Sequence, residues 1–185
     1  MNKYLIELKD IKKNFTHKKG IIELFKNVSL KIKQGELVAL TGPSGTGKSS
    51  LLHILALLDK PTSGRVIYSG IDSKKFNENK KNEMRRSQIS IIFQNNNLLS
   101  DFTAVENVLM PLIIRGESYK SSEVKAKKIL KDVNLYDRLN HFPSELSGGE
   151  QQRVAIARCL ISETNIILAD EPTGNLDFKT SNNVF

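Results

Sequence analysis

Apolar and polar residues alternate along the first part of the chain in the way that half-buried strands require. Residues 4–32 predict two or three strands, one of them at 28–32, and residues 66–68 before Gly70 predict another. We expect these strands to pair as a small antiparallel sheet, because alternation of this kind buries one face and leaves the other in water.

Fully apolar runs and helical repeats follow a different pattern. Residues 37–40 and 166–169 are short apolar runs that predict buried strands. From about 98 to 145 the period changes and predicts a helical insert. The apolar positions at helical spacing are Val105, Val108, Leu109, Leu112, Ala126, Ile129, Leu130 and Val133. Strands and helices together indicate an α/β protein.

A glycine-rich loop follows the apolar run at 37–40, and a helical pattern with leucines follows the loop. The loop has the spacing G-x-x-x-x-G-K-S and consists of Gly42, Pro43, Ser44, Gly45, Thr46, Gly47, Lys48 and Ser49, with Ser50 beside it. Such a loop directs backbone N–H groups at phosphates, Lys48 at the β and γ oxygens, and the Ser49 hydroxyl at Mg²⁺. The alternative is a glycine-rich turn that caps an ordinary helix.

Two acidic residues, Asp170 and Glu171, end the apolar run at 166–169. Taken alone, this pattern is typical of a buried strand with a solvated end. Beside a phosphate loop it favours a catalytic interpretation, in which Asp170 serves the Mg²⁺ shell and Glu171 orients the attacking water.

The most specific string begins at Leu146 and continues Ser147-Gly148-Gly149-Glu150-Gln151-Gln152-Arg153. It places a hydroxyl and two unhindered glycine amides at the start of a helix, where the helix dipole favours a phosphate. With the loop and the acidic pair, this string resembles the signature of the ATP-binding cassette (ABC) ATPases. The resemblance implies ATP and Mg²⁺ as cofactors and a second copy of the chain, bound head to tail, whose nucleotide faces Ser147, Gly148 and Gly149.

Three more residues take roles through this resemblance. Gln94, after the strand-like residues 90–93, matches the glutamine that contacts Mg²⁺ or the lytic water and senses the membrane partner, and a plain surface glutamine is the alternative. Phe15 matches an aromatic residue that stacks on adenine, and a core phenylalanine is the alternative. Asp177 matches a residue that reaches across the dimer, and an Asx turn after Gly174 is the alternative. Glu171, Gln94 and Lys48 are thus the catalytic candidates.

The family fold implied is a P-loop NTPase, an ABC nucleotide-binding domain with an antiparallel β subdomain and a helical insert, spanning 1–185 as one domain. Family members carry a switch histidine on a further strand beyond the acidic pair. No histidine follows His141 in this sequence, which ends at Phe185. We therefore expect the C-terminal part of the domain to be missing, and hydrolysis by this chain stays open while phosphate binding is expected.

Strings at 57–64, 97–112 and 169–177 resemble the LolD/MacB-type branch of the family. That branch implies an ATPase subunit that energises lipoprotein release together with permease subunits of the LolC/LolE kind. It would lie peripherally on the cytoplasmic face of the bacterial inner membrane. A MacB-like exporter ATPase, a cell-division ATPase and a non-catalytic nucleotide-binding fragment are the alternatives.

Composition limits the remaining classes. The 185 residues, 39% hydrophobic, suit one globular domain with a core, and no apolar run approaches the length of a membrane span. The net charge of +8 raises the question of nucleic acid, but the basic clusters lack interleaved aromatic residues, so we expect no nucleic-acid partner. A DNA-repair or chromosome ATPase would need a long coiled coil between Lys48 and Ser147, and that separation is too short. Cys159 is the only cysteine, which excludes an internal disulfide.

Overall fold

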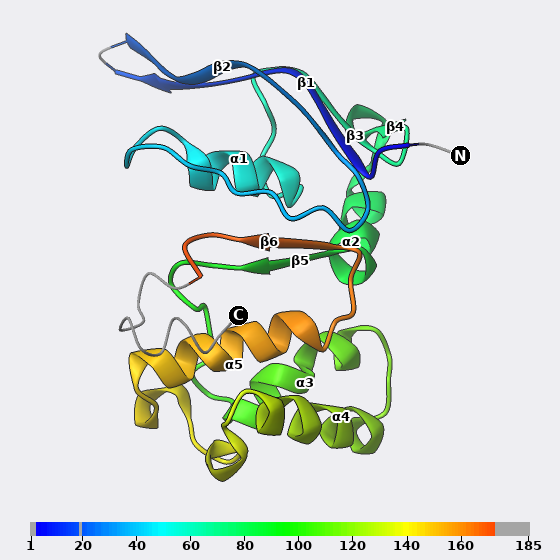
Figure 1. Cartoon of the computed structure of the whole chain (residues 1–185), viewed down its shortest axis with the longest axis vertical. Coiled ribbons are helices and arrows are strands. Elements are labelled where there is room, and N and C mark those ends of the chain that lie inside the picture. Colours follow the sequence, from blue (N-terminus) through cyan, green and yellow to red (C-terminus); the bar gives the residue numbers. More distant parts are fainter. Residues whose placement is uncertain (1–2, 19, 173–185) are drawn as a thin grey trace. The chain divides into compact units, whose positions relative to one another are not determined.

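The computed structural model of the chain describes residues 3–18 and 20–172. The chain divides into two compact units, Met1–Glu83 and Met84–Phe185. The first unit holds the glycine-rich loop, and the second holds the signature string and the acidic pair (Figure 1).

An antiparallel sheet of four strands forms most of the first unit. Its strands are β1 (Ile6–His17), β2 (Gly20–Ile32), β3 (Ser63–Tyr68) and β4 (Ile71–Asp72), in the order β2-β1-β3-β4. Leu8 on β1 lies opposite both Leu30 and Val66, so β1 is the strand around which the sheet is built. The predicted antiparallel sheet is confirmed, with two long strands accounting for residues 4–32.

The helix α1 (Lys48–Leu55) contacts this sheet through its apolar side. Leu51, Ile54 and Leu55 are buried, and the Tyr68 hydroxyl at the end of β3 donates a hydrogen bond to the Leu55 carbonyl at 2.6 Å. Burial raises the pKa of Tyr68 well above its ordinary value, so this phenol remains a donor. A short helix η1 (Ser73–Lys75) follows β4, and α2 (Glu78–Ser87) leads from the first unit into the second.

The apolar run at 37–40 forms no strand, so this prediction is wrong. Leu37 is fully exposed, and Leu40 is 43% exposed. In the part of the chain that the structure describes, the run makes no backbone hydrogen bond to a sheet. A strand exists only where a neighbour completes its ladder, and apolar composition indicates that a segment can be buried without supplying that neighbour.

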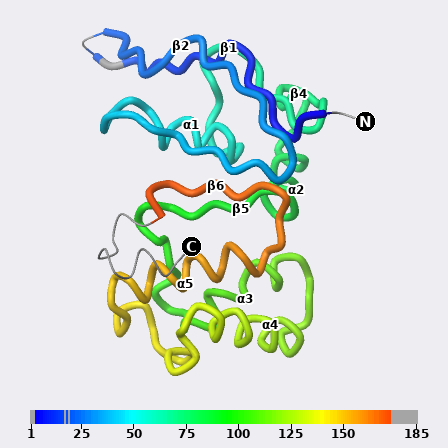
Figure 2. Tube along the Cα trace, in the orientation of Figure 1, coloured from blue at the N-terminus to red at the C-terminus, as the bar shows by residue number. Residues whose placement is uncertain are grey.

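A parallel pair of strands organises the second unit. β5 (Ile89–Ile92) and β6 (Ile166–Ala169) run side by side with Ile92 opposite Ala169, and the Asp170 N–H donates to the Ile92 carbonyl at 2.9 Å. Parallel strands need a long crossover, and the helical insert provides it. Figure 2 shows the helices of this unit gathered on one side of the pair.

The crossover consists of α3 (Ala104–Ile114), α4 (Tyr119–Asp132), the short turns η2 (Tyr136–Arg138) and η3 (Pro143–Glu145), and α5 (Gly148–Leu160). Its core confirms the predicted helical periodicity. The buried residues include Val105, Val108, Leu109, Leu112, Ala126, Leu130, Val154 and Ala157, with Ile129 and Val133 partly buried against them. In the described part of the chain, no helix combines the length and the apolar character needed to cross a membrane.

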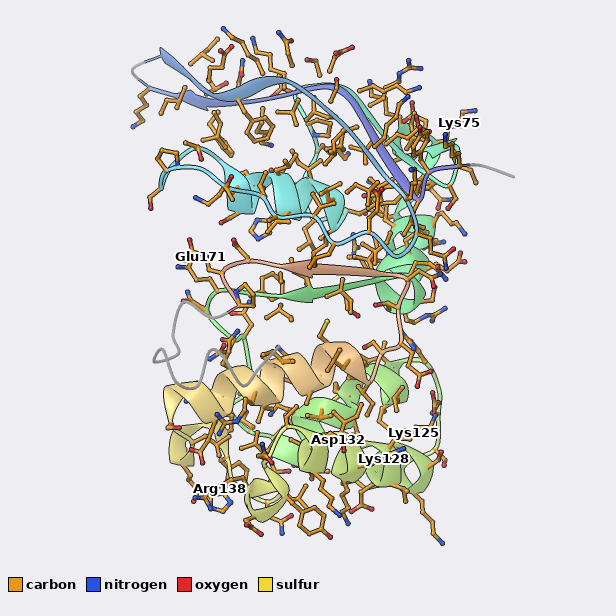
Figure 3. The ribbon with its side chains drawn as sticks, in the orientation of Figure 1. Lys75, Lys125, Lys128, Asp132, Arg138 and Glu171 are labelled. Atoms are coloured by element: carbon orange, nitrogen blue, oxygen red, sulfur yellow. The ribbon has the colours of Figure 1, made fainter. Side chains whose placement is uncertain are left out.

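The basic clusters lie on the surface and are partly balanced by acidic neighbours, as expected for solvated lysines. The ion pairs are Lys80–Glu83, Lys81–Glu78, Lys125–Glu117 and Lys127–Glu123, with separations of 2.6–2.9 Å. Figure 3 shows Lys125 and Lys128 together on α4. Exposed pairs of this kind each contribute about 0–1 kcal/mol, so they keep the surface soluble without determining the fold.

The signature helix α5 begins with a capping box. The Ser147 hydroxyl accepts from the Glu150 N–H at 3.3 Å, and the Glu150 carboxylate accepts from the Ser147 N–H at 2.8 Å. Arg138 donates to the same carboxylate at 2.9 Å. The Ser147 backbone and hydroxyl, with Arg138, hold the pKa of Glu150 at about 2, against an ordinary 4.5. The sequence contains this S-x-x-E spacing, which sequence reasoning overlooked.

This cap predicts an acid-sensitive helix. Because the pKa of Glu150 is lowered in the folded state, its stabilisation is complete above pH 4.5 and is lost as the pH falls toward 2. Glu150→Gln keeps the shape but removes the charge. We expect this variant to lose about 1 kcal/mol of unfolding free energy at pH 7 and to unfold less steeply with acid. Urea unfolding at a series of pH values measures both effects, and parallel pH profiles for the two proteins would contradict the assignment.

Candidate nucleotide site

The glycine-rich loop is exposed and lies beside the Lys48 ammonium. The Lys48 ammonium at the start of α1 donates to the carbonyls of Gly42 at 2.9 Å and Pro43 at 3.0 Å, so its charge lies over the loop. Thr46 donates its hydroxyl to the same Pro43 carbonyl at 2.8 Å. The residues from Gly42 to Thr46 are exposed, which leaves the loop open to a ligand. Ser49 and Ser50 lie in the first turn of α1.

Gly47 is required by the fold around this loop. Its backbone is left-handed, with φ of 92°, and a Cβ placed there would lie 2.6–2.7 Å from side-chain atoms of Leu24 and Phe25 on β2. A larger residue would therefore displace either the loop or the strand. The glycine fixes the turn from which α1, and with it Lys48, begins.

Phe15 lies on β1 in the first unit and is 45% exposed. Its exposure contradicts the alternative of an ordinary core phenylalanine. The Lys13 ammonium lies 4.9 Å from the centre of the ring, and Lys13 also pairs with Asp59 at 2.7 Å. The ring is therefore held by a cation–π contact while much of its surface stays free. Its stacking on adenine stays a prediction.

The acidic pair and Gln94 meet at one end of the parallel strands. Gln94 follows β5, Glu171 follows β6, and the Gln94 side-chain amide donates to the Glu171 carboxylate at 3.0 Å. Figure 3 shows Glu171 just beyond the end of β6. Asp170 beside it is buried, while Glu171 and Gln94 are exposed. The contact argues against a plain surface glutamine, because it joins the two residues that were predicted to act together.

Glu171 adopts an uncommon backbone conformation. Its φ is 48°, in the left-handed region that residues with a side chain rarely adopt. Such conformations cost about 1–3 kcal/mol and concentrate at functional sites. This backbone conformation directs the Glu171 carboxylate away from the line of the strand and toward Gln94.

The signature residues lie at the exposed N-terminal end of α5. Ser147 and Gly148 are exposed, and nothing lies within 4 Å of the position that a Gly148 Cβ would occupy. Glycine in a helix costs about 1 kcal/mol relative to alanine, and here neither backbone angle nor packing requires it. The free space therefore suits an approaching ligand. The Ser147 oxygen accepts one hydrogen bond in the cap, and its proton remains available to a phosphate.

The residues predicted for Mg²⁺ are distributed over the two units. Asp170 and Gln94 lie at the ends of β6 and β5, and Ser49 lies in the first unit. A buried carboxylate, an amide oxygen and a hydroxyl are oxygen ligands of the kind that Mg²⁺ takes. A common Mg²⁺ site for the three stays a prediction, and Asp177 lies outside the described residues.

One residue of this region was missed at the level of sequence. Arg158 on α5 donates to the carbonyls of Asn96 and Asn97 at 2.6 and 2.8 Å, directly after Gln94. The signal available in the sequence was a charged residue within the otherwise apolar stretch 154–159.

Comparison with known proteins gives the family of the chain. The profile of the ABC transporter family matches residues 25–174. The lipoprotein-releasing system ATP-binding protein LolD of Rickettsia bellii is 50% identical over the whole chain, which spans 81% of that protein. LolD of Legionella pneumophila is 45% identical over the whole chain and 82% of its own length. LolD of Geobacter metallireducens is 47% identical over 97% of the chain and 80% of its own length.

Solved structures give the same result for the fold. The dimeric structure of MJ0796, a bacterial ABC transporter cassette, has a TM-score of 0.91 at 44% identity and covers 97% of this chain and 79% of its own. A post-hydrolysis state of the same cassette, bound to ADP and Pi, has a TM-score of 0.91 at 43% identity with the same coverage. With the phosphate loop, the signature and the acidic pair all present, the chain belongs to the ABC transporter family of ATPases.

Proposed function

We propose that the chain binds MgATP at residues 42–50 and hydrolyses it with Glu171 and Gln94. The observation that carries this proposal is the 3.0 Å contact between the Gln94 amide and the Glu171 carboxylate, beside the buried Asp170. Phosphoryl transfer depends on positioning and charge compensation, and a fixed carboxylate with an amide beside it can hold a water molecule for attack.

Each residue has a distinct part in the reaction. Lys48 compensates the charge of the β and γ phosphates, and Ser49 and Asp170 would hold Mg²⁺, which would neutralise more of it. Glu171 accepts a proton from the attacking water while the water oxygen bonds to the γ-phosphorus. The bond from that phosphorus to the bridging oxygen breaks, giving ADP and phosphate. Phe15 holds the adenine by stacking.

A second copy of the chain completes the site. Ser147, Gly148 and Gly149 present a hydroxyl and backbone N–H groups at the start of α5, which suits the γ-phosphate of a nucleotide held by a partner copy. The MJ0796 cassette is dimeric by its description, which supports assembly of two copies. Asp177 is assigned to the same interface.

The transported cargo follows from the relatives. LolD proteins are the ATP-binding proteins of lipoprotein-releasing systems, and three of them are 45–50% identical to this chain. We therefore assign the chain to a lipoprotein-releasing transporter, bound to LolC/LolE-like permease subunits at the cytoplasmic face of the inner membrane. Closing and opening of the ATPase dimer would drive the permease between two conformations.

Lys48→Ala tests the phosphate loop. Removing this cation leaves the β and γ phosphates poorly compensated, and we expect ATP affinity to fall by about 2 kcal/mol, roughly 30-fold. Equilibrium titration with a fluorescent ATP analogue measures the change. Lys26→Ala is the control, because Lys26 is an exposed lysine of the same unit that pairs with Glu23 on the surface. Equal affinities for Lys48→Ala and the unaltered chain would remove the loop from the nucleotide site.

Glu171→Gln separates binding from hydrolysis. The amide keeps the shape but cannot accept a proton, so kcat is expected to fall by about 10²–10³ while ATP affinity stays constant. The variant should also accumulate as a dimer in MgATP, visible by size-exclusion chromatography with light scattering. Glu163→Gln, an exposed carboxylate in the turn before β6, is the control and should hydrolyse ATP normally. Normal turnover by Glu171→Gln would assign the base elsewhere.

The cargo assignment is tested by reconstitution with LolC/LolE-type permease subunits in membrane vesicles that carry a labelled lipoprotein. ATP should release the lipoprotein to a soluble acceptor, and at subsaturating ATP Lys48→Ala should slow release because it binds ATP roughly 30-fold more weakly. A complex that assembles and hydrolyses ATP but releases no lipoprotein would contradict the cargo and leave the ATPase assignment intact.

A further inference from the structure

The segment that carries Gln94 is held from both sides. Before it, the Ile92 carbonyl accepts from the Asp170 N–H at 2.9 Å. After it, the carbonyls of Asn96 and Asn97 accept from the Arg158 guanidinium at 2.6 and 2.8 Å. Gln94 itself is exposed, and these two attachments hold the backbone on either side of it.

Of the two attachments, the one through Arg158 holds the part of the segment that is less stable by itself. Asn97 has a left-handed backbone, with φ of 46°, and Asn96 is buried with a side-chain oxygen that receives no hydrogen bond from residues 3–18 and 20–172. A loop with these features is not stable by its own local preferences. Arg158 supplies two donors to two successive carbonyls, and its planar guanidinium fixes the direction of both, which a freely rotating ammonium does not.

Arg158 itself is held in place by the helix around it. Its neighbours Ile156 and Cys159 are buried against Ile92, so α5 is packed on the strand from which Gln94 emerges. Burial lowers the pKa of the Arg158 guanidinium, but an arginine remains charged at any physiological pH. Ser147, the cap of α5, lies eleven residues before Arg158, about 16 Å along one rigid helix.

We propose that Arg158 is a positioning residue, which fixes Gln94 against Glu171 from the same helix that presents Ser147 to a partner's nucleotide. This inference rests on the proposed function, because it concerns how the hydrolytic pair is set. It also assigns α5 a second task. Its first turn contacts the nucleotide of the other copy, and its last turns hold the glutamine of its own copy.

The structure provides a matched control. Arg115 also donates to two backbone carbonyls, those of Arg86 at 2.7 Å and Ser162 at 2.6 Å, in the same unit. Arg115→Lys and Arg158→Lys therefore remove the same kind of contact. Only the second removes it from the segment of Gln94.

The first measurement is independent of ATP hydrolysis. In the full 185-residue chain with ¹⁵N-labelled glutamine, the Gln94 side-chain amide resonance is assigned by its loss in Gln94→Ala. Glu171→Gln shows how that resonance moves when the carboxylate is replaced. Arg158→Lys should move it in the same direction and speed its exchange with water by roughly tenfold, the protection of about one hydrogen bond. Arg115→Lys should leave it unchanged.

The second measurement is kinetic. Arg158→Lys should lower kcat by roughly tenfold with an unchanged KM for ATP, because the nucleotide is held elsewhere and only the alignment of the water is lost. In a Gln94→Ala background the same change should cost nothing further, since its effect passes through Gln94.

The outcomes separate the two claims. An unmoved Gln94 resonance in Arg158→Lys, an equal shift in Arg115→Lys, or additive losses of kcat with Gln94→Ala would each overturn the role of Arg158. If the unaltered chain shows the Gln94 resonance as expected but hydrolyses no ATP, the proposed function fails, and the NMR comparison still decides whether Arg158 sets the position of Gln94.

Discussion

The hydrogen bond from the Asp170 N–H to the Ile92 carbonyl is the contact on which the pairing of Gln94 with Glu171 depends. It extends the parallel ladder of β5 and β6 by one step, so both strands end at the same edge. Gln94 and Glu171 leave the two strands from that edge. Glu171 leaves its strand with a left-handed backbone, φ of 48°.

The helix α5 connects this edge to the signature. Its N-terminus is stabilised by the reciprocal bonds of Ser147 and Glu150, its middle packs in the core of the helical insert, and Arg158 near its end holds the loop after Gln94. A capped and buried helix moves as a rigid body, so a displacement of Ser147 also displaces Arg158.

In the phosphate loop, the backbone conformation and not side-chain contacts sets the position of the residues. Gly47 allows a turn that any larger residue would break, and α1 starts from it with Lys48 directed back over the loop. The loop can remain exposed because the buried face of α1, with Leu51 and Ile54, holds it on the antiparallel sheet. The predicted phosphate loop is therefore an exposed segment that a buried core holds in place.

By itself the sequence determined the antiparallel sheet, the helical insert and the residue types of the nucleotide site, because periodicity and local spacing encode them. It misjudged residues 37–40, since an apolar run cannot state which neighbour will pair with it. Only the tertiary structure decided that Phe15 is exposed, that Gln94 contacts Glu171 across 77 positions of sequence, and that Arg158 holds Asn96 and Asn97. These contacts join segments that are distant along the chain, and the pairing of β5 with β6 brings their ends together.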